Sequence, residues 1–294
     1  MTDTHQLIDR ATALLTRLEA LLPEPPPAPD WQRQLAFRWR KRFQHGYLEP
    51  VAHPHKLRLR DLQRIERQKT ELVRNTRQFL AGQPANNALL WGARGTGKST
   101  LIKALLNDFA ADGLRMIEVD KQDLIDLPEI VSQLYGLPQR FLIYCDDLSF
   151  EADDASYKAL KAILDGSIAA APDNVLLYAT SNRRHLLPEY MTDNQDSRVQ
   201  PDGELHHGEA VEEKISLSER FGIWLSFHPF KQDDYLAVVG YWLEELGYRQ
   251  PVDEELRKLA LRWALTRGSR SGRVAWQFAR DWVGRQALAG QPDN

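Results

Sequence analysis

The octapeptide GARGTGKS at residues 92–99 constrains the fold of this 294-residue chain more than any other feature. The apolar run Ala88-Leu89-Leu90-Trp91 precedes it and predicts a buried strand. Apolar residues at helical spacing follow it as far as Gly113, where a helix is expected to stop. A strand, a glycine-rich turn and a helix in this order bring backbone N–H groups and a helix N-terminus to one point. The sequence therefore predicts an anion-binding turn.

The same octapeptide matches the phosphate-binding pattern G-x-x-x-x-G-K-[ST] at every fixed position. Lys98 is expected to reach the β- and γ-phosphates of a nucleotide, and the Ser99 hydroxyl to bind Mg²⁺. The alternative is a glycine-rich turn that matches by chance, and the correct pattern on both flanks disfavours it. The residues predicted to bind the nucleotide here are Gly92, Ala93, Arg94, Gly95, Thr96, Gly97, Lys98, Ser99 and Thr100.

The composition is that of an ordinary globular protein. The formal net charge of −3 disfavours a molecule that binds polyanions over its whole surface. The sequence has no run of eighteen apolar residues and no basic-then-apolar leader, so we expect no membrane span and no secretion signal. Cys145 is the only cysteine, which excludes an intramolecular disulfide. These features together predict a cytoplasmic protein.

Four further apolar segments predict strands at residues 115–119, 141–145, 175–179 and 223–227. Helical segments separate most of them, and residues 61–80 are expected to form a helix that leads into the first strand. This alternation predicts a three-layer α/β fold, with a parallel sheet covered by helices on both faces. Ligands of such sheets bind at the carboxyl ends of the strands.

The pattern after the last predicted strand is wholly helical. Residues 232–246, 252–266 and 272–288 each carry an apolar stripe, so residues 230–294 are expected to form a compact helical lid. Residues 190–214 are polar and are interpreted as a long surface loop.

The N-terminal part divides differently. Residues 1–30 are expected to hold an amphipathic helix over 4–22 and a proline-rich linker. A segment rich in bases and aromatics, 31–60, precedes the nucleotide-binding domain, which is expected to span 61–229. Its first part, 31–43, could bind a nucleic-acid backbone. The alternative, which we favour, is a helix whose aromatic face packs and whose arginines are solvated.

Polar residues follow two of the predicted strands. Asp146 and Asp147 end one of them, where Asp146 is expected to act on Mg²⁺ and Asp147 to polarise the attacking water. Glu151 is a weaker candidate base because it lies further beyond the strand end. Asn182 ends the next strand and could orient that water or contact the γ-phosphate. A hydrated turn at either place is the simpler alternative.

Arginines near the chain's C-terminal half are candidates for contacts with the phosphates. Arg220 precedes the last predicted strand and could project into the nucleotide site of a neighbouring subunit; the alternative is a surface ion pair. Arg273, or Arg270 in reserve, could reach the phosphates from the lid, unless both are solvated residues of a helix cap. His206 and His207 lie near glutamates, but adjacent histidines point apart, so a metal site there is disfavoured.

The order of these parts resembles that of the AAA+ ATPases over roughly residues 50–290, with a phosphate loop, an acidic strand end, a polar sensor, an arginine finger and a lid arginine. The chain also resembles a bacterial family of uncharacterised AAA+-like P-loop proteins, classed as a domain of unknown function. The stretches that carry this second resemblance are residues 89–98, 146–151, 179–186, 212–222 and 267–276.

The resemblance implies ATP and Mg²⁺ as cofactors, a homo-oligomeric ring that completes each active site, and contact of residues 56–65 with adenine. Many AAA+ proteins carry Asp-Glu where this chain has Asp146-Asp147, so slow turnover or a nucleotide switch is also an option. The leading hypothesis is an ATPase that couples ATP binding and hydrolysis to remodelling or loading of a macromolecular partner. The alternatives are a nucleic-acid-binding loader that uses residues 31–43, a nucleotide-gated switch and, less favoured, a small-molecule kinase.

Overall fold

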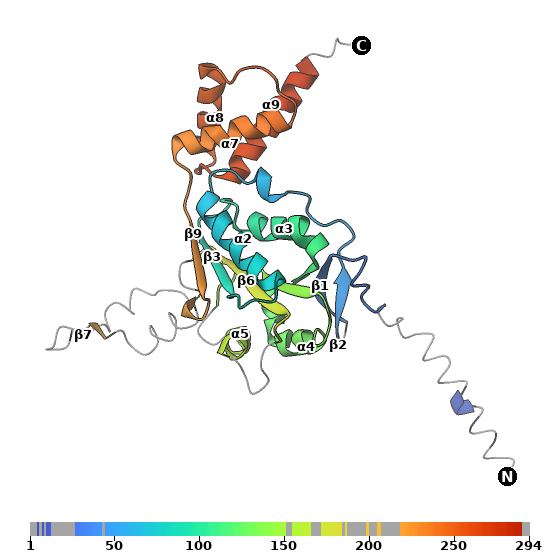
Figure 1. Cartoon of the computed structure of the whole chain (residues 1–294). Coiled ribbons are helices and arrows are strands. Elements are labelled where there is room, and N and C mark those ends of the chain that lie inside the picture. The colour runs from blue at the N-terminus through green and yellow to red at the C-terminus, as the bar shows by residue number, and fades with distance from the viewer. Residues whose placement is uncertain are drawn as a thin grey trace. The chain divides into compact units, whose positions relative to one another are not determined.

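A computed structural model describes residues 5, 8, 10–12, 27–42, 45–150, 155–165, 172–183, 186, 198–199, 205–206 and 218–289. The chain divides into two compact units, residues 1–30 and 31–294 (Figure 1). Of the helix predicted over 4–22, the structure describes only residues 5, 8 and 10–12, which are helical.

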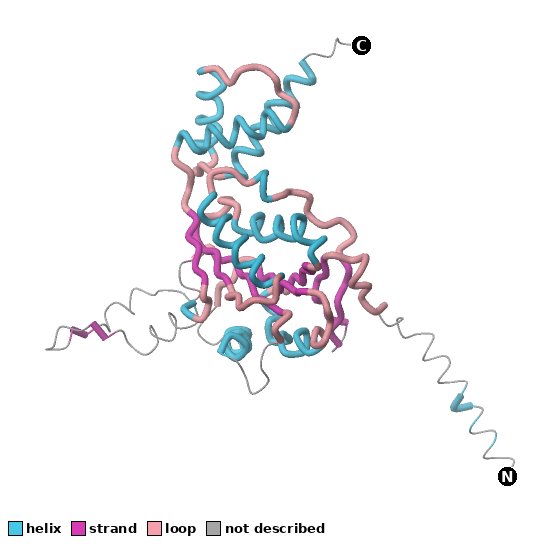
Figure 2. Tube along the Cα trace, in the orientation of Figure 1, coloured by secondary structure: helices cyan, strands magenta, loops and turns pink. Residues whose placement is uncertain are grey.

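Seven strands within the described residues form one sheet, in the order β2-β1-β4-β5-β6-β3-β9. Figure 2 shows the strands in magenta. Neighbouring strands are parallel, except that β2 pairs with β1 in the antiparallel sense. The predicted parallel α/β sheet is thus confirmed, with two additional strands at one edge. The strands are β1 (Ala36–Arg42), β2 (His45–Pro50), β3 (Ala88–Gly92), β4 (Leu114–Glu118), β5 (Arg140–Cys145), β6 (Val175–Ser181) and β9 (Ile223–Phe227).

Helices cover both faces of this sheet, which gives the three predicted layers (Figure 1). Alternation along β5 supplies both cores: Phe141, Ile143 and Cys145 face one layer, and Leu142 and Tyr144 face the other. One face carries α2 (Glu66–Leu80) and α3 (Lys98–Phe109), and the other carries α4 (Leu127–Ser132) and α5 (Ala155–Asp165). Short 3-10 turns occupy Leu59–Asp61, Ala110–Asp112 and Lys121–Asp126.

The helix favoured for residues 31–43 is wrong, because residues 36–42 form strand β1. Phe37 and Trp39 are fully buried, whereas Arg38 and Arg40, which alternate with them, stay partly exposed, so the apolar period is two and not 3.6. Arg38, Arg40 and Lys41 of this strand are matched by carboxylates within 4 Å. The ion pairs are Arg38–Glu118 at 2.7 Å, Arg40–Asp120 at 3.3 Å, Arg40–Glu49 at 3.4 Å and Lys41–Asp126 at 2.6 Å.

The three predicted C-terminal helices are present as α7 (Gln232–Glu245), α8 (Glu254–Thr266) and α9 (Gly272–Ala289). They share a core of their own, which includes Tyr235, Leu256 and Phe278. Hydrogen bonds between described residues join this lid to the body: Tyr241 Oη donates to Asp61 Oδ1 at 2.9 Å, and the Arg273 N–H donates to the Gly95 carbonyl at 3.2 Å.

Three further features were predicted from the sequence: the environment of Cys145, the segment 190–214 and the absence of a membrane span. Cys145 is buried in β5, as expected for a structural cysteine. Within residues 190–214 the structure describes only β7 (Arg198–Val199) and β8 (Leu205–His206), which pair antiparallel. None of the described helices is at once long enough and apolar enough to cross a bilayer.

Candidate functional site

The glycine-rich loop joins the carboxyl end of β3 to α3 and is anchored on β9. The Ala93 N–H donates to the Phe227 carbonyl at 3.0 Å. A Cβ at Gly92 would come within 2.0 Å of the same carbonyl oxygen, so only glycine allows this approach. Inside the loop, Thr96 Oγ1 donates to the Ala93 carbonyl at 2.8 Å. The loop is therefore held in shape by contacts within its own chain.

Lys98 is the first residue of α3, and its side chain is buried across the loop. Its Nζ donates to the carbonyls of Gly92 at 2.7 Å and Ala93 at 2.8 Å, and to Asn182 Oδ1 at 3.1 Å. Burial lowers the pKa of Lys98, although the nearby Asp147 and Asp146 charges oppose that effect. The ammonium group is thus fixed at the point where a bound phosphate would meet the loop.

Asp146 follows β5 and receives two hydroxyl hydrogen bonds on one oxygen. Ser99 Oγ donates to Asp146 Oδ1 at 2.7 Å, and Thr180 Oγ1 donates to the same atom at 2.6 Å. Burial alone would raise the pKa of Asp146, but the hydrogen bonds from Thr180 and Ser99 outweigh it, and the net pKa is lowered. The carboxylate is therefore ionised near neutral pH and lies beside the serine hydroxyl.

Asp147 adopts a left-handed backbone, with φ of 51°, directly after Asp146. Its N–H donates to Thr180 Oγ1 at 2.9 Å, so Thr180 orients both carboxylates. Asn182 Nδ2 donates to Asp147 Oδ1. Since Asn182 also accepts from Lys98, one amide connects the lysine of the loop with the second carboxylate. Sequence reasoning predicted Asn182 at this strand end but did not predict a role for Thr180.

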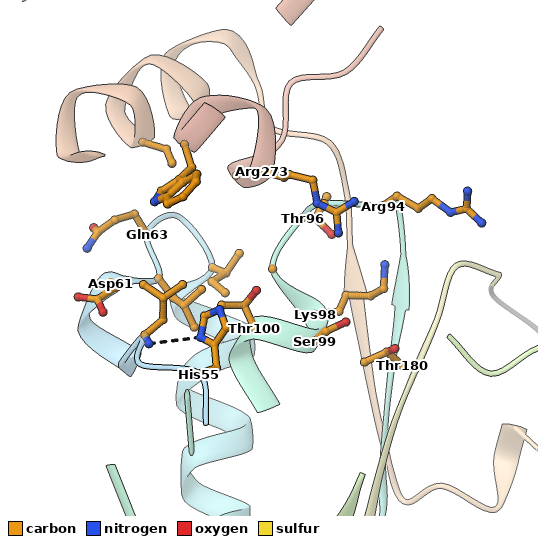
Figure 3. Close-up of a pocket in the computed structure, with 18 of the residues that line it drawn as sticks. His55, Asp61, Gln63, Arg94, Thr96, Lys98, Ser99, Thr100, Thr180 and Arg273 are labelled. Carbon is orange, nitrogen blue, oxygen red and sulfur yellow. Dashed lines mark hydrogen bonds between the residues drawn. The ribbon is translucent and has the colours of Figure 1, made fainter. Parts of the chain in front are cut away.

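The lid closes one side of a cavity of about 860 Å³ that begins at the phosphate loop. Arg273 lines this cavity, and Figure 3 shows its side chain descending toward Thr96 and Lys98. Arg94 points away from them and its side chain is 78% exposed. Arg270 is not one of the described residues that line the cavity. Its backbone carbonyl accepts a hydrogen bond from the Phe230 N–H at 2.9 Å.

The far end of the cavity is largely apolar. It is formed by the segment before α2 and by the lid, and its apolar lining residues are Leu57, Leu62, Ile65, Phe230, Val238, Trp242 and Trp276. Polar groups at the rim are His55, Asp61 and Gln63 (Figure 3). Asn107 of α3 fixes the segment by donating from Nδ2 to the His55 and Leu57 carbonyls, both at 2.6 Å. The two tryptophans were missed, because only the folded chain brings the lid to residues 55–65.

Arg220 is not brought to this cavity within one chain. It lies in the turn before β9, where the Phe221 N–H donates to the Ser218 carbonyl at 3.1 Å. That turn is at the amino end of β9, whereas the phosphate loop follows the carboxyl end of the parallel strand β3. Arg220 therefore lies at the amino ends of the parallel strands, and the pair Asp147–Asn182 lies at their carboxyl ends.

The residues present fit a nucleotide with magnesium. Ser99 and Asp146 offer the hydroxyl and carboxylate oxygens that Mg²⁺ prefers. Gly95 lets the lid approach the loop closely, since a Cβ there would come within 2.9 Å of Ser271 Oγ. Elsewhere in the described part of the chain no cluster of three His, Cys, Asp or Glu residues could hold a metal, and His207 lies outside that part.

The parallel sheet, the phosphate loop, the acidic strand end and the helical lid define a P-loop protein with an AAA+-like fold. A family model described as "Protein of unknown function (DUF815)" matches residues 32–286, and the chain belongs to this family. Replication factor C large subunit of Sulfolobus acidocaldarius is 32% identical over 120 residues, which are 37% of this chain and 27% of that protein.

Solved structures show the same fold at low sequence identity. The Thermotoga maritima RuvB Holliday junction branch migration motor has a TM-score of 0.51 and 14% identity, covering 79% of this chain and 66% of that one. The Aeropyrum pernix Orc1 protein in complex with DNA has a TM-score of 0.56 and 17% identity, over 78% and 62%. The FIGL-1 AAA domain with ADP has a TM-score of 0.52 and 17% identity, over 82% and 77%.

Proposed function

We propose that the chain binds and hydrolyses ATP with Mg²⁺ and couples this cycle to remodelling or loading of a macromolecular partner. The observation that carries the proposal is the hydrogen-bonded series Lys98–Asn182–Asp147, beside the pair Ser99–Asp146. These residues come from three separate segments and meet at one end of a cavity of about 860 Å³. A triphosphate at this end and a base at the apolar end account for both halves of the cavity.

Each polar residue has a distinct task in this proposal. Lys98 and Arg273 bind the phosphates, and Ser99 with Asp146 hold the metal, which when bound offsets negative charge on the β- and γ-phosphates. Asp147 polarises the attacking water, and Asn182 orients it. The loop residues Gly92, Ala93, Arg94, Gly95, Thr96, Gly97 and Thr100 surround the phosphates.

Adenine is the base we propose for the apolar end. Trp242 and Trp276 line it, with ring centroids 6.4 Å apart, and an aromatic face can stack on a purine. The sequence has no Asn-Lys-x-Asp signature of guanine binding. The ADP named in the FIGL-1 complex supports the same nucleotide class.

The position of Arg220 supports the homo-oligomer that we propose. This arginine lies at the amino ends of the parallel strands, whereas its own phosphate loop lies at their carboxyl ends. We therefore propose that it acts on the nucleotide of a neighbouring copy. Mixing Lys98→Ala and Arg220→Ala subunits tests this directly, since mixed interfaces would combine an intact loop with an intact Arg220. Regained ATPase activity is the expected result, and full activity of a strictly monomeric sample would exclude action in trans.

A nucleic acid is the partner class best supported by the comparisons, since RuvB, Orc1 and replication factor C are named for work on DNA. Residues 31–43, however, are a weak candidate for the contact surface. Arg38, Arg40 and Lys41 are already paired with carboxylates of the same protein. Cytoplasmic location is part of the same proposal.

The nucleotide-gated switch is the second candidate, and the geometry of Asp147 favours it. Asp147 is one methylene shorter than glutamate, its side chain is 54% exposed, and Asn182 holds it by a hydrogen bond. A switch would bind ATP tightly with negligible turnover. A small-molecule kinase would instead transfer phosphate to a metabolite without net hydrolysis, which a metabolite screen would detect.

The deciding experiment measures ATP binding by calorimetry and phosphate release on the same full-length preparations. Lys98→Ala is expected to abolish tight binding, whereas Asp147→Asn is expected to bind ATP and lose turnover. Lys158→Ala is the matched control, because Lys158 is an exposed lysine on α5, away from the cavity. Well-folded wild-type protein that takes up no adenine nucleotide would contradict the proposal.

A further inference from the structure

Tyr144 is a buried residue of β5, and packing alone does not explain why it carries a hydroxyl group. Its side chain is 0% exposed, and its hydroxyl makes no hydrogen bond of standard geometry, although the side chains of Ser99 and Asp146 lie close enough to affect its pKa. Tyr178, its partner in register on β6, is equally buried, but its hydroxyl is bonded to Asn75 Nδ2 at 2.9 Å and Thr76 Oγ1 at 3.0 Å. Two neighbouring tyrosines on one face of the sheet therefore differ in whether the hydroxyl is satisfied.

The surroundings place Tyr144 beneath the metal-binding residues. Residues two apart on a strand share a face, so Tyr144 lies on the α3 side, the side from which Ser99 bonds Asp146. Lys103 follows Ser99 by one helical turn, and its Nζ lies 5.2 Å from the centre of the Tyr144 ring. Lys103 is itself paired with Glu118 at 3.6 Å, which keeps the ammonium over the ring.

The nearby carboxylate is within electrostatic reach of the phenol. Burial raises the pKa of Tyr144, and the charge of Asp146 raises it further. The bonds from Ser99 and Thr180 both end on Oδ1 of Asp146. The Tyr144 hydroxyl is thus a third donor near this carboxylate.

We propose that Tyr144 is a positioning residue for the Ser99–Asp146 pair: its hydroxyl supports these two metal-binding oxygens from the buried side. This inference rests on the proposed Mg²⁺-nucleotide function. Packing alone does not account for the hydroxyl, because phenylalanine would fill the same space without burying an unpaired polar atom. Groups that hold metal ligands in place typically change metal affinity about 10- to 100-fold when removed.

The test compares Tyr144→Phe with the control Tyr178→Phe in the full-length protein. ATP affinity is measured by calorimetry with Mg²⁺ and with EDTA, and Mn²⁺ affinity of the ADP-bound protein by electron paramagnetic resonance. For Tyr144→Phe we expect unchanged affinity in EDTA, a metal-dependent gain in ATP affinity reduced about tenfold, and Mn²⁺ affinity weakened to a similar degree. The melting temperature should stay the same or rise, because the variant removes an unpaired buried hydroxyl.

Tyr178→Phe should behave in the opposite way. It loses two hydrogen bonds, so its melting temperature should fall, while its metal-dependent gain in ATP affinity should equal that of the wild type. A wild-type gain and Mn²⁺ affinity in Tyr144→Phe would overturn this inference alone. Absence of any nucleotide binding by the wild-type protein would overturn the proposed function, and this inference with it.

Discussion

The backbone N–H of Arg273 donates to the carbonyl of Gly95 at 3.2 Å, which joins the first turn of α9 to the phosphate loop. The contact is close: a Cβ at Gly95 would lie 2.9 Å from Ser271 Oγ and 3.2 Å from Arg273 Cβ. Movement of the loop is therefore expected to displace the lid. In the proposed function, this contact is the route by which a bound nucleotide would change the position of α7, α8 and α9.

Arg273→Ala is expected to weaken ATP binding by about tenfold or more and ADP binding less, because a charged hydrogen bond to phosphate is worth about 1.5–3 kcal/mol. Fluorescence titration with labelled ATP and ADP measures both affinities. Arg270→Ala is the matched control, since the Arg270 backbone carbonyl holds Phe230 and its side chain does not line the cavity. Equal losses in the two variants would remove the special role given to Arg273.

Asn182→Ala is expected to reduce ATP turnover by about 100-fold, in the range found when an oriented polar group is lost from an active site. The amide joins Lys98 to Asp147, so its loss frees both side chains from one another. ATP affinity should change little, because Lys98 retains its bonds to Gly92 and Ala93. Single-turnover phosphate release separates the two effects. A variant that hydrolyses ATP at the wild-type rate would show that Asn182 is only a turn residue.

Local patterns were enough to predict the centre of this fold. The strand β3, the glycine-rich loop and α3 are contiguous in sequence, so residues 88–109 carry all the information for their own arrangement. The strand ends at Asp146 and Asn182 could be placed at one edge, because parallel strands bring their carboxyl ends together. The three lid helices likewise show their own apolar stripes.

The parts that were not predicted depend on contacts between distant segments. In β1, two buried aromatics alternate with arginines, and nothing local shows that carboxylates from 80 residues away pair with Arg38 and Arg40. The base end of the cavity depends on the same kind of contact, since Tyr241 meets Asp61 across 180 residues. Thr180 was passed over because its hydroxyl has a function only beside Asp146.

Gly46→Ala is expected to destabilise the protein by about 1–3 kcal/mol, the usual cost of overpacking. A Cβ on Gly46 of β2 would lie 1.7 Å from a ring carbon of Trp39, which is fully buried and bonded through Nε1 to Asp126 at 3.0 Å. The Trp39 ring therefore cannot move away from the added methyl group. Urea unfolding monitored by circular dichroism measures the change in the free energy of unfolding.

Gly284→Ala is the matched control for the same experiment. Gly284 lies in α9, and a Cβ there would meet nothing within 4 Å. Alanine in an open helical position stabilises by about 0.4–1 kcal/mol. Opposite signs for the two glycine substitutions are expected, and a neutral Gly46→Ala would show that the β1–β2 edge can repack.

His55 at the cavity rim is expected to make the stability of the protein depend on pH. Burial lowers the pKa of His55 below its usual 6.5, and the positive charge of Lys103 lowers it further. Between pH 6.5 and the lower folded pKa, the unfolded chain binds a proton that the folded chain does not, so this stability contribution is lost as pH falls through that window. His55→Asn can still accept from the Leu57 N–H, the bond that His55 Nδ1 now makes at 3.3 Å. Melting temperatures from pH 7.5 to 5.5 should therefore fall less in His55→Asn than in the wild type, and identical slopes would mean that His55 titrates as freely in the folded protein as in the unfolded chain.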